Sequence, residues 1–454
     1  MGLSIIILAA GAGSRLKSTL PKVLHEVGGK PLLQHVLDAA KALEPDTLCV
    51  VVGFGASAIR ARFEEEAITW VTQPELKGTG DAVLQALPFI QDERVMVLYG
   101  DVPLVLPSTL ASLAAISQGV GLLTAHVEDP TGYGRIVRHA GGSIVGIVEE
   151  KDASPAQKRI DEVNSGMMVL PVRQLKTWLS RLTNKNASGE YYLTDIIAMA
   201  VSEKITMTAI HPSVEEEIYG VNTRAQLSTL ENFYQEAHTD RLMDEGVTFR
   251  DPARFDMRGN LNVEQDVIFD VNVICEGDVS IGEGSIIGPD VILKNVTIGK
   301  HVEIRAFCHI EEAVIKDHAI IGPFARIRPE TVIEEHARIG NFVEVKKSMI
   351  GEGSKINHLS YIGDASLGKH VNVGAGTITC NYDGVNKHHT TVEDDVFIGS
   401  NTALVAPLTI GKGATIAAGS TLTKNAPSGQ LTLSRTPQKT IPEWKRPLKN
   451  KEKT

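Results

Sequence analysis

The sequence predicts two folded parts of different class, an α/β doubly wound domain followed by a parallel β-helix. Over the segment 1–225, short apolar runs alternate with helical patterns, which is typical of a mostly parallel sheet covered by helices on both faces. In the second part, an aliphatic residue followed by glycine recurs about every six residues. Neither a helix nor a flat sheet has that period, whereas a coil of stacked short strands does. The length of 454 residues also favours more than one core.

The first part is predicted to contain strands that alternate with helices. Buried strands are expected at 4–10, 47–54 and 94–100, and helices at 31–44 and 81–90. Ligands of doubly wound sheets bind beyond the carboxyl ends of the strands. That rule directs attention to the glycine turn after the first strand and to "GDVP" after the third.

Residues 226–246 are predicted to form a helical linker, so the domains run over 1–225 and 247–454. In the β-helix each aliphatic residue is expected to point inward and to stack on its counterpart one coil later. We attribute the recurring glycine to the geometry of the turns. The repeat leaves the handedness open, and crossover rules favour a right-handed coil.

Composition narrows the class of protein. A net charge of −10 argues against a general nucleic-acid or membrane partner, and the N-terminal apolar run of about seven residues is too short to span a bilayer. The four cysteines lack zinc-ligand spacing, which indicates reduced, buried thiols in a cytoplasmic protein. They are Cys49, Cys275, Cys308 and Cys380.

The segment "LAAGAGSRLKSTLPK" carries the first candidate chemistry. Leu16 stands where a dinucleotide fingerprint needs its third glycine, and the glycine that a P-loop places before Lys-Ser is missing. What remains is a glycine turn whose backbone N–H groups can face an anion, with Arg15 and Lys22 to neutralise phosphate charge. A plain strand-to-helix turn is the competing interpretation.

Asp101 ends a strand at the ligand-binding edge, where a carboxylate can hold Mg²⁺ against a triphosphate. An aspartate in that place is more often a turn-former. Asn222 lies in a second glycine turn, "EIYGVNT".

Taken together, these motifs resemble a known family. "LAAGAGSRLKSTLPK" matches the L-x-x-G-x-G-(T/S)-R-x5-6-P-K signature of sugar-1-phosphate nucleotidyltransferases. With "QPELKGTGDAV", "YGDVPL", "PTGYGRIV", "EEKDA", "NSGMMV", "YYLTD" and "GVNTR", the chain from residue 3 to about 446 is similar to the bifunctional bacterial enzymes that make UDP-N-acetylglucosamine, a precursor of peptidoglycan and lipopolysaccharide.

The resemblance implies a Rossmann-like, GT-A-like nucleotidyltransferase fold and a left-handed β-helix that forms homotrimers. It implies Arg15 and Lys22 as catalytic residues on the phosphates and Mg²⁺ on Asp101 and Asn222. Glu149 could otherwise be an ordinary surface carboxylate. The residues implied for UTP and N-acetylglucosamine are Leu8, Ala9, Ala10, Gly11, Lys22, Gln73, Gly78, Thr79, Tyr99, Gly100, Asp101, Gly134, Glu149, Asn164 and Asn222.

The β-helix requires its own evidence for chemistry. Arg328 and Lys346 are separated by about one coil, so they can share a face and hold a phosphate between them. Acyl transfer from a thioester to an amine needs a base, and a histidine with a near-neutral pKa suits that role. As a lone residue, His358 would more often be a surface histidine.

The resemblance makes His358 the general base, in "INHLSY". It implies that glucosamine-1-phosphate is bound by Arg328, Lys346, Tyr361 and Asn372. Acetyl-CoA would be bound by Ala375, Asn381, Tyr382, Ser400, Ala418 and Arg435, with Asn381 and Tyr382 bordering both substrates.

One interruption of the repeat is predicted to be a functional loop. "TITCNYDGVNKHHT" (377–390) departs from the six-residue period, because the spacing from Val373 to Ile398 is not a multiple of six. The adjacent His388 and His389 lack further ligands at metal spacing. The Lys- and Pro-rich tail is expected to be solvated, with the last ten residues partly disordered.

Two alternatives to a two-site enzyme remain. A monofunctional nucleotidyltransferase would use the β-helix only for assembly or regulation. A non-enzymatic subunit would have lost Arg15, Lys22 or Asp101, all of which are present.

Overall fold

The structure, a computed structural model, describes residues 2–447. The chain forms two compact units, which divide between His238 and Thr239, inside helix α7 (Arg224–Asp244). Each unit is described by itself.

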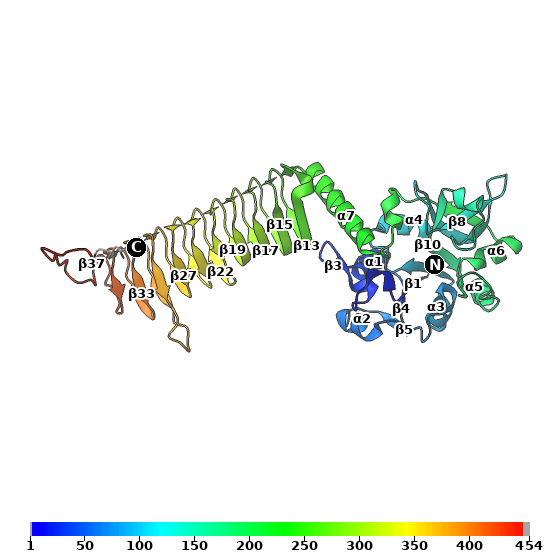
Figure 1. Cartoon of the computed structure of the whole chain (residues 1–454), viewed down its shortest axis with the longest axis horizontal. Coiled ribbons are helices and arrows are strands. Elements are labelled where there is room, and N and C mark those ends of the chain that lie inside the picture. The colour runs from blue at the N-terminus through cyan, green and yellow to red at the C-terminus, as the bar shows by residue number, and fades with distance from the viewer. Residues whose placement is uncertain (1, 448–454) are drawn as a thin grey trace, which may run out of the picture. The chain divides into compact units, whose positions relative to one another are not determined.

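The first unit is built on a sheet with the order β11-β7-β10-β6-β1-β4-β5 (Figure 1). The pairings β6-β1, β1-β4 and β4-β5 are parallel, whereas β10 runs antiparallel to both β6 and β7. Along this path the sheet is therefore mostly parallel with one reversed strand, and β8 and β9 extend it by antiparallel pairing to β10 and to each other. The strands of this unit are β1 (Leu3–Ala9), β2 (Glu26–Val27), β3 (Lys30–Pro31), β4 (Thr47–Val52), β5 (Thr69–Thr72), β6 (Arg94–Tyr99), β7 (Val120–His126), β8 (Gly134–Arg138), β9 (Ile144–Val148), β10 (Glu162–Pro171) and β11 (Met207–Ile210).

Helices cover both faces of this sheet. On β1, Ile5 and Ile7 pack into one core with α1, α2 and α4, whereas Ile6 and Leu8 pack into the other core with α3, α5 and α6. A strand that is buried on both faces has a continuous run of apolar residues, which is why "IIIL" predicts a strand between two layers of helices. The helices are α1 (Leu32–Lys41), α2 (Ala56–Arg62), α3 (Thr79–Ala86), α4 (Pro107–Ala114), α5 (Val172–Leu179) and α6 (Asp195–Ser202).

The second unit is a parallel β-helix whose strands stack coil upon coil (Figure 1). Two long sheets, of 11 and 15 strands, form its walls. The strands are β12 (Thr248–Phe249), β13 (Phe255–Val263), β14 (Ile268–Phe269), β15 (Val273–Ile281), β16 (Ile286–Ile287), β17 (Ile292–Ile298), β18 (Glu303–Ile304), β19 (His309–Ile315), β20 (Ile320–Ile321), β21 (Arg326–Ile327), β22 (Thr331–Ile333), β23 (Arg338–Asn341), β24 (Glu344–Lys346), β25 (Met349–Ile350), β26 (Lys355–His358), β27 (Tyr361–Gly363), β28 (Ala365–Leu367), β29 (Asn372–Val373), β30 (Ile378–Cys380), β31 (Thr390–Val392), β32 (Phe397–Ile398), β33 (Ala403–Val405), β34 (Leu408–Ile410), β35 (Thr415–Ile416), β36 (Thr421–Leu422) and β37 (Leu431–Thr432).

One inward column of aliphatic side chains shows how the repeat builds the core. Its members pair in register from coil to coil and are buried. The column is Ile281, Ile298, Ile315, Ile333, Ile350, Leu367, Val392 and Ile410. Successive members are about three repeats apart, except that the step from Leu367 to Val392 is longer by about one repeat. The interruption at 377–390 therefore lengthens one coil and leaves the stack in register.

The recurring glycine has a different cause from the one that the sequence suggested. Several corners hold a non-glycine residue at positive φ, such as Phe324 at 56°. At Gly351, a Cβ atom would lie 2.3 Å from the carbonyl oxygen of Gly368 in the next coil. Close approach of neighbouring coils, rather than turn geometry, excludes a side chain there.

The cysteines follow the prediction with one exception. All four are free, and Cys49, Cys275 and Cys308 are buried, whereas Cys380 is half-buried because it lies where the chain leaves the coil. Within the described part of the chain, no helix is both long and apolar enough to cross a bilayer. The tail from 435 to 447 is exposed, and the rest of the predicted disordered tail, 448–454, lies outside the described residues.

Candidate active sites

A cavity of about 370 Å³ lies at the carboxyl ends of β1 and β6. Sequence reasoning named many of its lining residues: Leu8, Ala9, Ala10, Gly11, Lys22, Gln73, Gly78, Thr79, Tyr99 and Asp101. The expected nucleotide-binding turn from Leu8 to Gly13 also contains Ala12, which lines the cavity, whereas Val23, Leu76, Ala82 and Glu190 were missed. Glu190 directly precedes the family motif "YYLTD", and its position next to that motif could have identified it.

Three side chains from distant segments meet at one side of this cavity. The Lys22 ammonium forms an ion pair with Asp101 and donates a 2.8 Å hydrogen bond to Asn222 Oδ1. The carboxylate and amide oxygens of the predicted metal ligands thus converge on a single positive charge. Hard oxygen ligands that gather around a cation fit a divalent ion of the magnesium class.

A second set of contacts fixes the loop before α3. Gln73 is buried, and its amide donates to Gly78 O at 3.0 Å and to Asp81 Oδ2 at 2.7 Å. The hydroxyl of Thr79 accepts a 3.0 Å bond from the backbone N–H of Leu193. The distant segment around "YYLTD" therefore closes this wall of the cavity.

Tyr99 lies at the end of β6 and lines the cavity. Its ring lies against Gly166, where a Cβ atom would come within 2.4 Å of Tyr99 Cε2 at a φ of 86°. Burial, with the nearby charges of Glu149 and Asp101, raises the pKa of the Tyr99 phenol, which keeps it a neutral hydroxyl.

Glu149 and Asn164 lie beyond Tyr99, outside the cavity lining. Burial raises the pKa of Glu149, helped by the charges of Asp195 and Asp152, although Thr194 donates a 2.7 Å bond to its carboxylate. Gly134 pairs with Asn164 across β8 and β10, and a Cβ atom on it would lie 3.5 Å from the Glu149 carboxylate. Asn164 is buried, and its side-chain oxygen has no hydrogen-bond partner. A buried acceptor without a donor is available to a bound N–H or O–H group.

Two further predicted residues, Arg15 and Gly100, are not among the residues that line the cavity. Arg15 is exposed on a 3-10 turn (Ser14–Leu16) outside the cavity lining. Gly100 is buried, and its N–H donates a 3.0 Å bond to Leu8 O, so it holds the β6 end against β1.

In the β-helix, several predicted residues form one column along a corner. The parallel pairings of β26, β29, β32 and β35 can each be continued by two residues beyond the last paired residues. His358 then stacks on Ala375 in the next coil, and the stack continues through Ser400 and Ala418. Arg435 Nη1 then donates a 2.9 Å bond to Ala418 O. The predicted base therefore stands at one end of the predicted acetyl-CoA residues.

Asn341 is a further residue of this column that sequence reasoning missed. It pairs with His358 across β23 and β26, and its Oδ1 lies 3.1 Å from His358 Nδ1. Because an amide oxygen only accepts, the imidazole proton lies on Nδ1 and the lone pair on Nε2. Asn341 lies one coil before His358 in the repeat, and this spacing could have identified it from the sequence.

A cluster of cations occupies the adjacent face. Arg328 forms a 2.8 Å ion pair with Glu344, one coil away. Lys387, with a contribution from Arg328, lowers the pKa of the Lys346 ammonium. The hydroxyl of Tyr361 lies over Gly363, which pairs with Lys346. Crowded like charges favour an anion between them. Lys387, which the prediction omitted, comes from the inserted loop.

The loop that lengthens the coil is held at its base by Asn381. This residue is buried, and its amide donates to the buried carboxylate of Asp364. Tyr382 is 59% exposed. The two histidines support the loop, because His388 pairs with Asp383 at 2.7 Å and His389 contacts the Ser366 hydroxyl at 3.0 Å.

Asn372 lies apart from the His358 column. It pairs with Lys355 and Phe397 on β26 and β32, three residues before Ala375.

Three family models match this chain. A MobA-like NTP transferase domain matches residues 5–164, a GMPPB C-terminal domain matches 309–406, and bacterial transferase hexapeptide repeats match 389–424. The class of protein is therefore a nucleotidyltransferase joined to a hexapeptide-repeat transferase.

Curated relatives cover nearly the whole chain. "Bifunctional protein GlmU" of Marinobacter nauticus is 52% identical over 98% of this chain and 99% of its own length. Proteins of the same name from Aromatoleum aromaticum and Ralstonia nicotianae are also 52% identical, over 99% of this chain and 99% of their own lengths. The chain belongs to the family of bifunctional GlmU proteins.

Family membership confirms the main sequence predictions. The fold is a nucleotidyltransferase domain followed by a left-handed β-helix of hexapeptide repeats, as the resemblance implied. The protein is a bifunctional enzyme with nucleotidyltransferase and acetyltransferase activities. Membership implies a divalent metal, nucleotide-sugar and acetyl-CoA substrates, and association through the repeats.

Proposed function

We propose that the protein makes UDP-N-acetylglucosamine in two steps in the cytoplasm. The β-helix acetylates glucosamine-1-phosphate with acetyl-CoA, and the first unit then transfers UMP from UTP to N-acetylglucosamine-1-phosphate, releasing pyrophosphate. The observation that carries this proposal is the column that places His358 in line with Ala375, Ser400 and Ala418. A β-helix used only for assembly has no need of a base there. The four free thiols support a reducing compartment.

Uridyl transfer would take place in the cavity of the first unit. The turn from Leu8 to Gly13 and the Gln73 loop would hold the nucleotide, while Lys22 and Arg15 neutralise phosphate charge. A sugar-phosphate oxygen is already a nucleophile, so in-line attack on the α-phosphate needs positioning and charge stabilisation more than a base. Asp101 and Asn222 would hold Mg²⁺, which screens the phosphate charge and orients the triphosphate when bound.

The sugar would lie beyond Tyr99. Glu149 would accept a hydrogen bond from a hydroxyl. Asn164 would accept the acetamide N–H through its unpartnered side-chain oxygen. Thr79 and Gly134 complete this predicted wall.

Acetyl transfer would take place at the His358 corner. Arg328 and Lys346 would bind the phosphate of glucosamine-1-phosphate, with Tyr361 and Asn372 on the sugar. His358 Nε2 would take the proton from the amine, a C–N bond would form at the acetyl carbon, and the C–S bond would break to release CoA. Asn381 and Tyr382 would border the acetyl group. Arg435 would meet the phosphates of CoA.

The decisive assay for this function uses the full chain with glucosamine-1-phosphate, acetyl-CoA, UTP and Mg²⁺. We expect one CoA and one pyrophosphate to be released for each UDP-N-acetylglucosamine formed. If glucosamine-1-phosphate never causes CoA release while N-acetylglucosamine-1-phosphate is still uridylated, the protein is instead a monofunctional nucleotidyltransferase.

We further propose that three chains assemble through the β-helix. An exposed apolar ladder, stacked at a corner of successive coils, supports this assembly. Its rings stack at centroid distances of 4.8 and 5.3 Å, and it continues to an exposed leucine beside His358. The ladder consists of Phe307, Phe324, Phe342 and Leu359. A neighbouring chain on this ladder would bring its own residues to the His358 corner.

Light scattering after size exclusion should give a mass of three chains for the wild type. Phe324→Glu together with Phe342→Glu should shift the protein toward the monomer, because two charges would then face the apolar contact. The rate of acetyl transfer should decrease as the measured mass of the assembly decreases, while the rate of uridyl transfer should stay unchanged. An unchanged mass would show that the ladder is not the subunit contact, and Phe397→Glu serves as the matched exposed control.

A further inference from the structure

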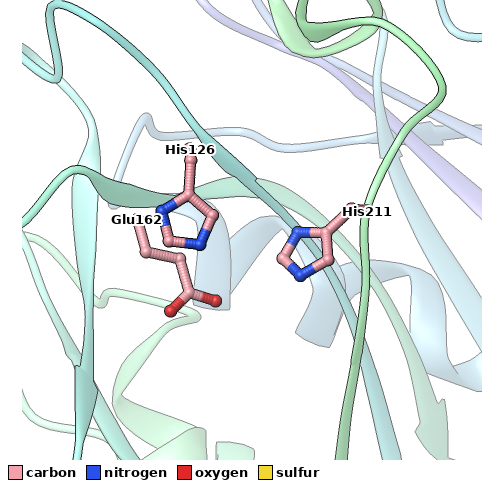
Figure 2. A group of neighbouring side chains, drawn as sticks. All are labelled: His126, Glu162 and His211. Carbon is pink, nitrogen blue, oxygen red and sulfur yellow. The ribbon is translucent and has the colours of Figure 1, made fainter.

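Two histidines and a glutamate gather at the sheet edge of the first unit, outside the cavity described above. Figure 2 shows the His126 ring and the Glu162 carboxylate side by side, with the His211 ring facing them. One ligand atom from each residue lies within 4.8 Å of the other two. His126 ends β7, Glu162 begins β10, and His211 follows β11, so the strand order creates the cluster.

Hydrogen bonds orient both imidazoles in the same way. His211 Nδ1 lies 2.9 Å from Thr124 O, and His126 Nδ1 lies 3.2 Å from Asp161 Oδ1. Because a carbonyl and a carboxylate only accept, each Nδ1 carries the proton and donates it. Each Nε2 therefore keeps its lone pair. Metal-binding histidines are commonly fixed through their second nitrogen in this manner.

Glu162 supplies a charged oxygen. It is buried, and its carboxylate accepts bonds from Thr124 Oγ1 at 3.0 Å and from Arg138 at 2.6 and 2.7 Å. Burial alone would raise the pKa of Glu162, but the bonds from Arg138 and Thr124 outweigh it and lower that pKa. A carboxylate has about four lone-pair sites, so one remains for a further partner.

We propose that His126, Glu162 and His211 bind a divalent ion of the zinc class. Imidazole and carboxylate ligands select such an ion over Mg²⁺, and three protein ligands leave a position for water. Ligand atoms about 2.1 Å from a tetrahedral zinc ion lie about 3.4 Å apart. Because the His126 side chain is 60% exposed, it has room to rotate by the small distance required. The ion ties β7, β10 and the segment after β11 together.

A second group of histidines offers a comparison within the same chain. His301, His318 and His336 stack along a corner of the β-helix at centroid distances of 5.3 and 4.9 Å. Their rings are nearly parallel, with interplanar angles of 16° and 3°. Parallel stacked rings do not aim their nitrogens at a common point, so this ladder is a control and not a second candidate.

The test is titration of the chelator-treated full chain with Zn²⁺ by calorimetry, in excess Mg²⁺ so that oxygen-ligand sites are filled. Cobalt absorption reports the ligands independently. We expect one ion per chain, and we expect His126→Ala and His211→Ala each to weaken zinc affinity at least about 100-fold and to abolish the visible cobalt bands. The controls His139→Ala and His318→Ala should bind as the wild type does.

The proposal is overturned if the wild type binds no Zn²⁺ under these conditions. It is also overturned if both cluster variants bind as tightly as the wild type, or if His318→Ala loses the ion instead. Circular dichroism of His126→Ala and His211→Ala, which change exposed side chains, shows that any loss of binding occurs in folded protein.

Discussion

Asp101→Ala is expected to lower uridyl transfer by at least about 1,000-fold, which corresponds to about 4 kcal/mol of transition-state stabilisation. The change removes the carboxylate of the proposed metal site and also the ion-pair partner of Lys22. Both effects weaken the stabilisation of phosphate charge. Pyrophosphate release from UTP and N-acetylglucosamine-1-phosphate measures this half-reaction, and CoA release from the β-helix should stay at the wild-type rate.

Asp129→Ala is the matched control, because this aspartate is exposed in the same unit. It should leave both half-reactions unchanged. Asn222→Ala should instead raise the Mg²⁺ concentration that gives half the maximal rate, since the amide is the weaker ligand. If Asp101→Ala keeps more than about a tenth of the wild-type uridyl transfer, the assignment of this carboxylate is wrong.

His358→Ala should produce the opposite pattern. We expect acetyl transfer to fall about 100- to 10,000-fold, the usual contribution of a general base, with uridyl transfer unaffected. The physical reason is that the ammonium group of glucosamine-1-phosphate has no nucleophilic lone pair until a base removes its proton. Thiol release from acetyl-CoA measures the rate.

Asn341→Ala extends this test to the residue that orients the base. It removes the acceptor for His358 Nδ1, so acetyl transfer should fall by less than in His358→Ala, without loss of glucosamine-1-phosphate affinity. His370→Ala, an exposed histidine of the same unit, should have no effect. Near-normal acetyl transfer in His358→Ala would contradict the base assignment.

Local regularities made much of the fold predictable. The apolar run in β1 and the six-residue repeat show which side chains each short segment buries, because a segment must be apolar wherever its side chains face a core. The reason offered for glycine was wrong, because the close contact at Gly351 involves a backbone one coil away. A sequence period reveals that coils stack without revealing which atoms touch.

Fewer residues of the candidate sites than of the fold could be predicted from the sequence, except where family motifs identified them. Glu190, Asn341 and Lys387 were missed because each reaches its site through a loop or a coil pairing. The cluster of His126, Glu162 and His211 was missed for the same reason, since three separate strands bring it together. Conversely, Arg15 belongs to a specific family motif, and yet it is not among the residues that line the cavity.

By itself, then, the sequence determined the two fold classes, the glycine turn and the place where one coil is longer, because each of these features depends on a pattern of residues that are close together in the chain. Only the tertiary structure decided that Lys22 bridges Asp101 and Asn222, that Asn341 sets the proton on His358, and that Asn164 keeps an unpartnered oxygen. Such contacts depend on strand order and on loop paths between segments far apart in the chain, which no local pattern encodes.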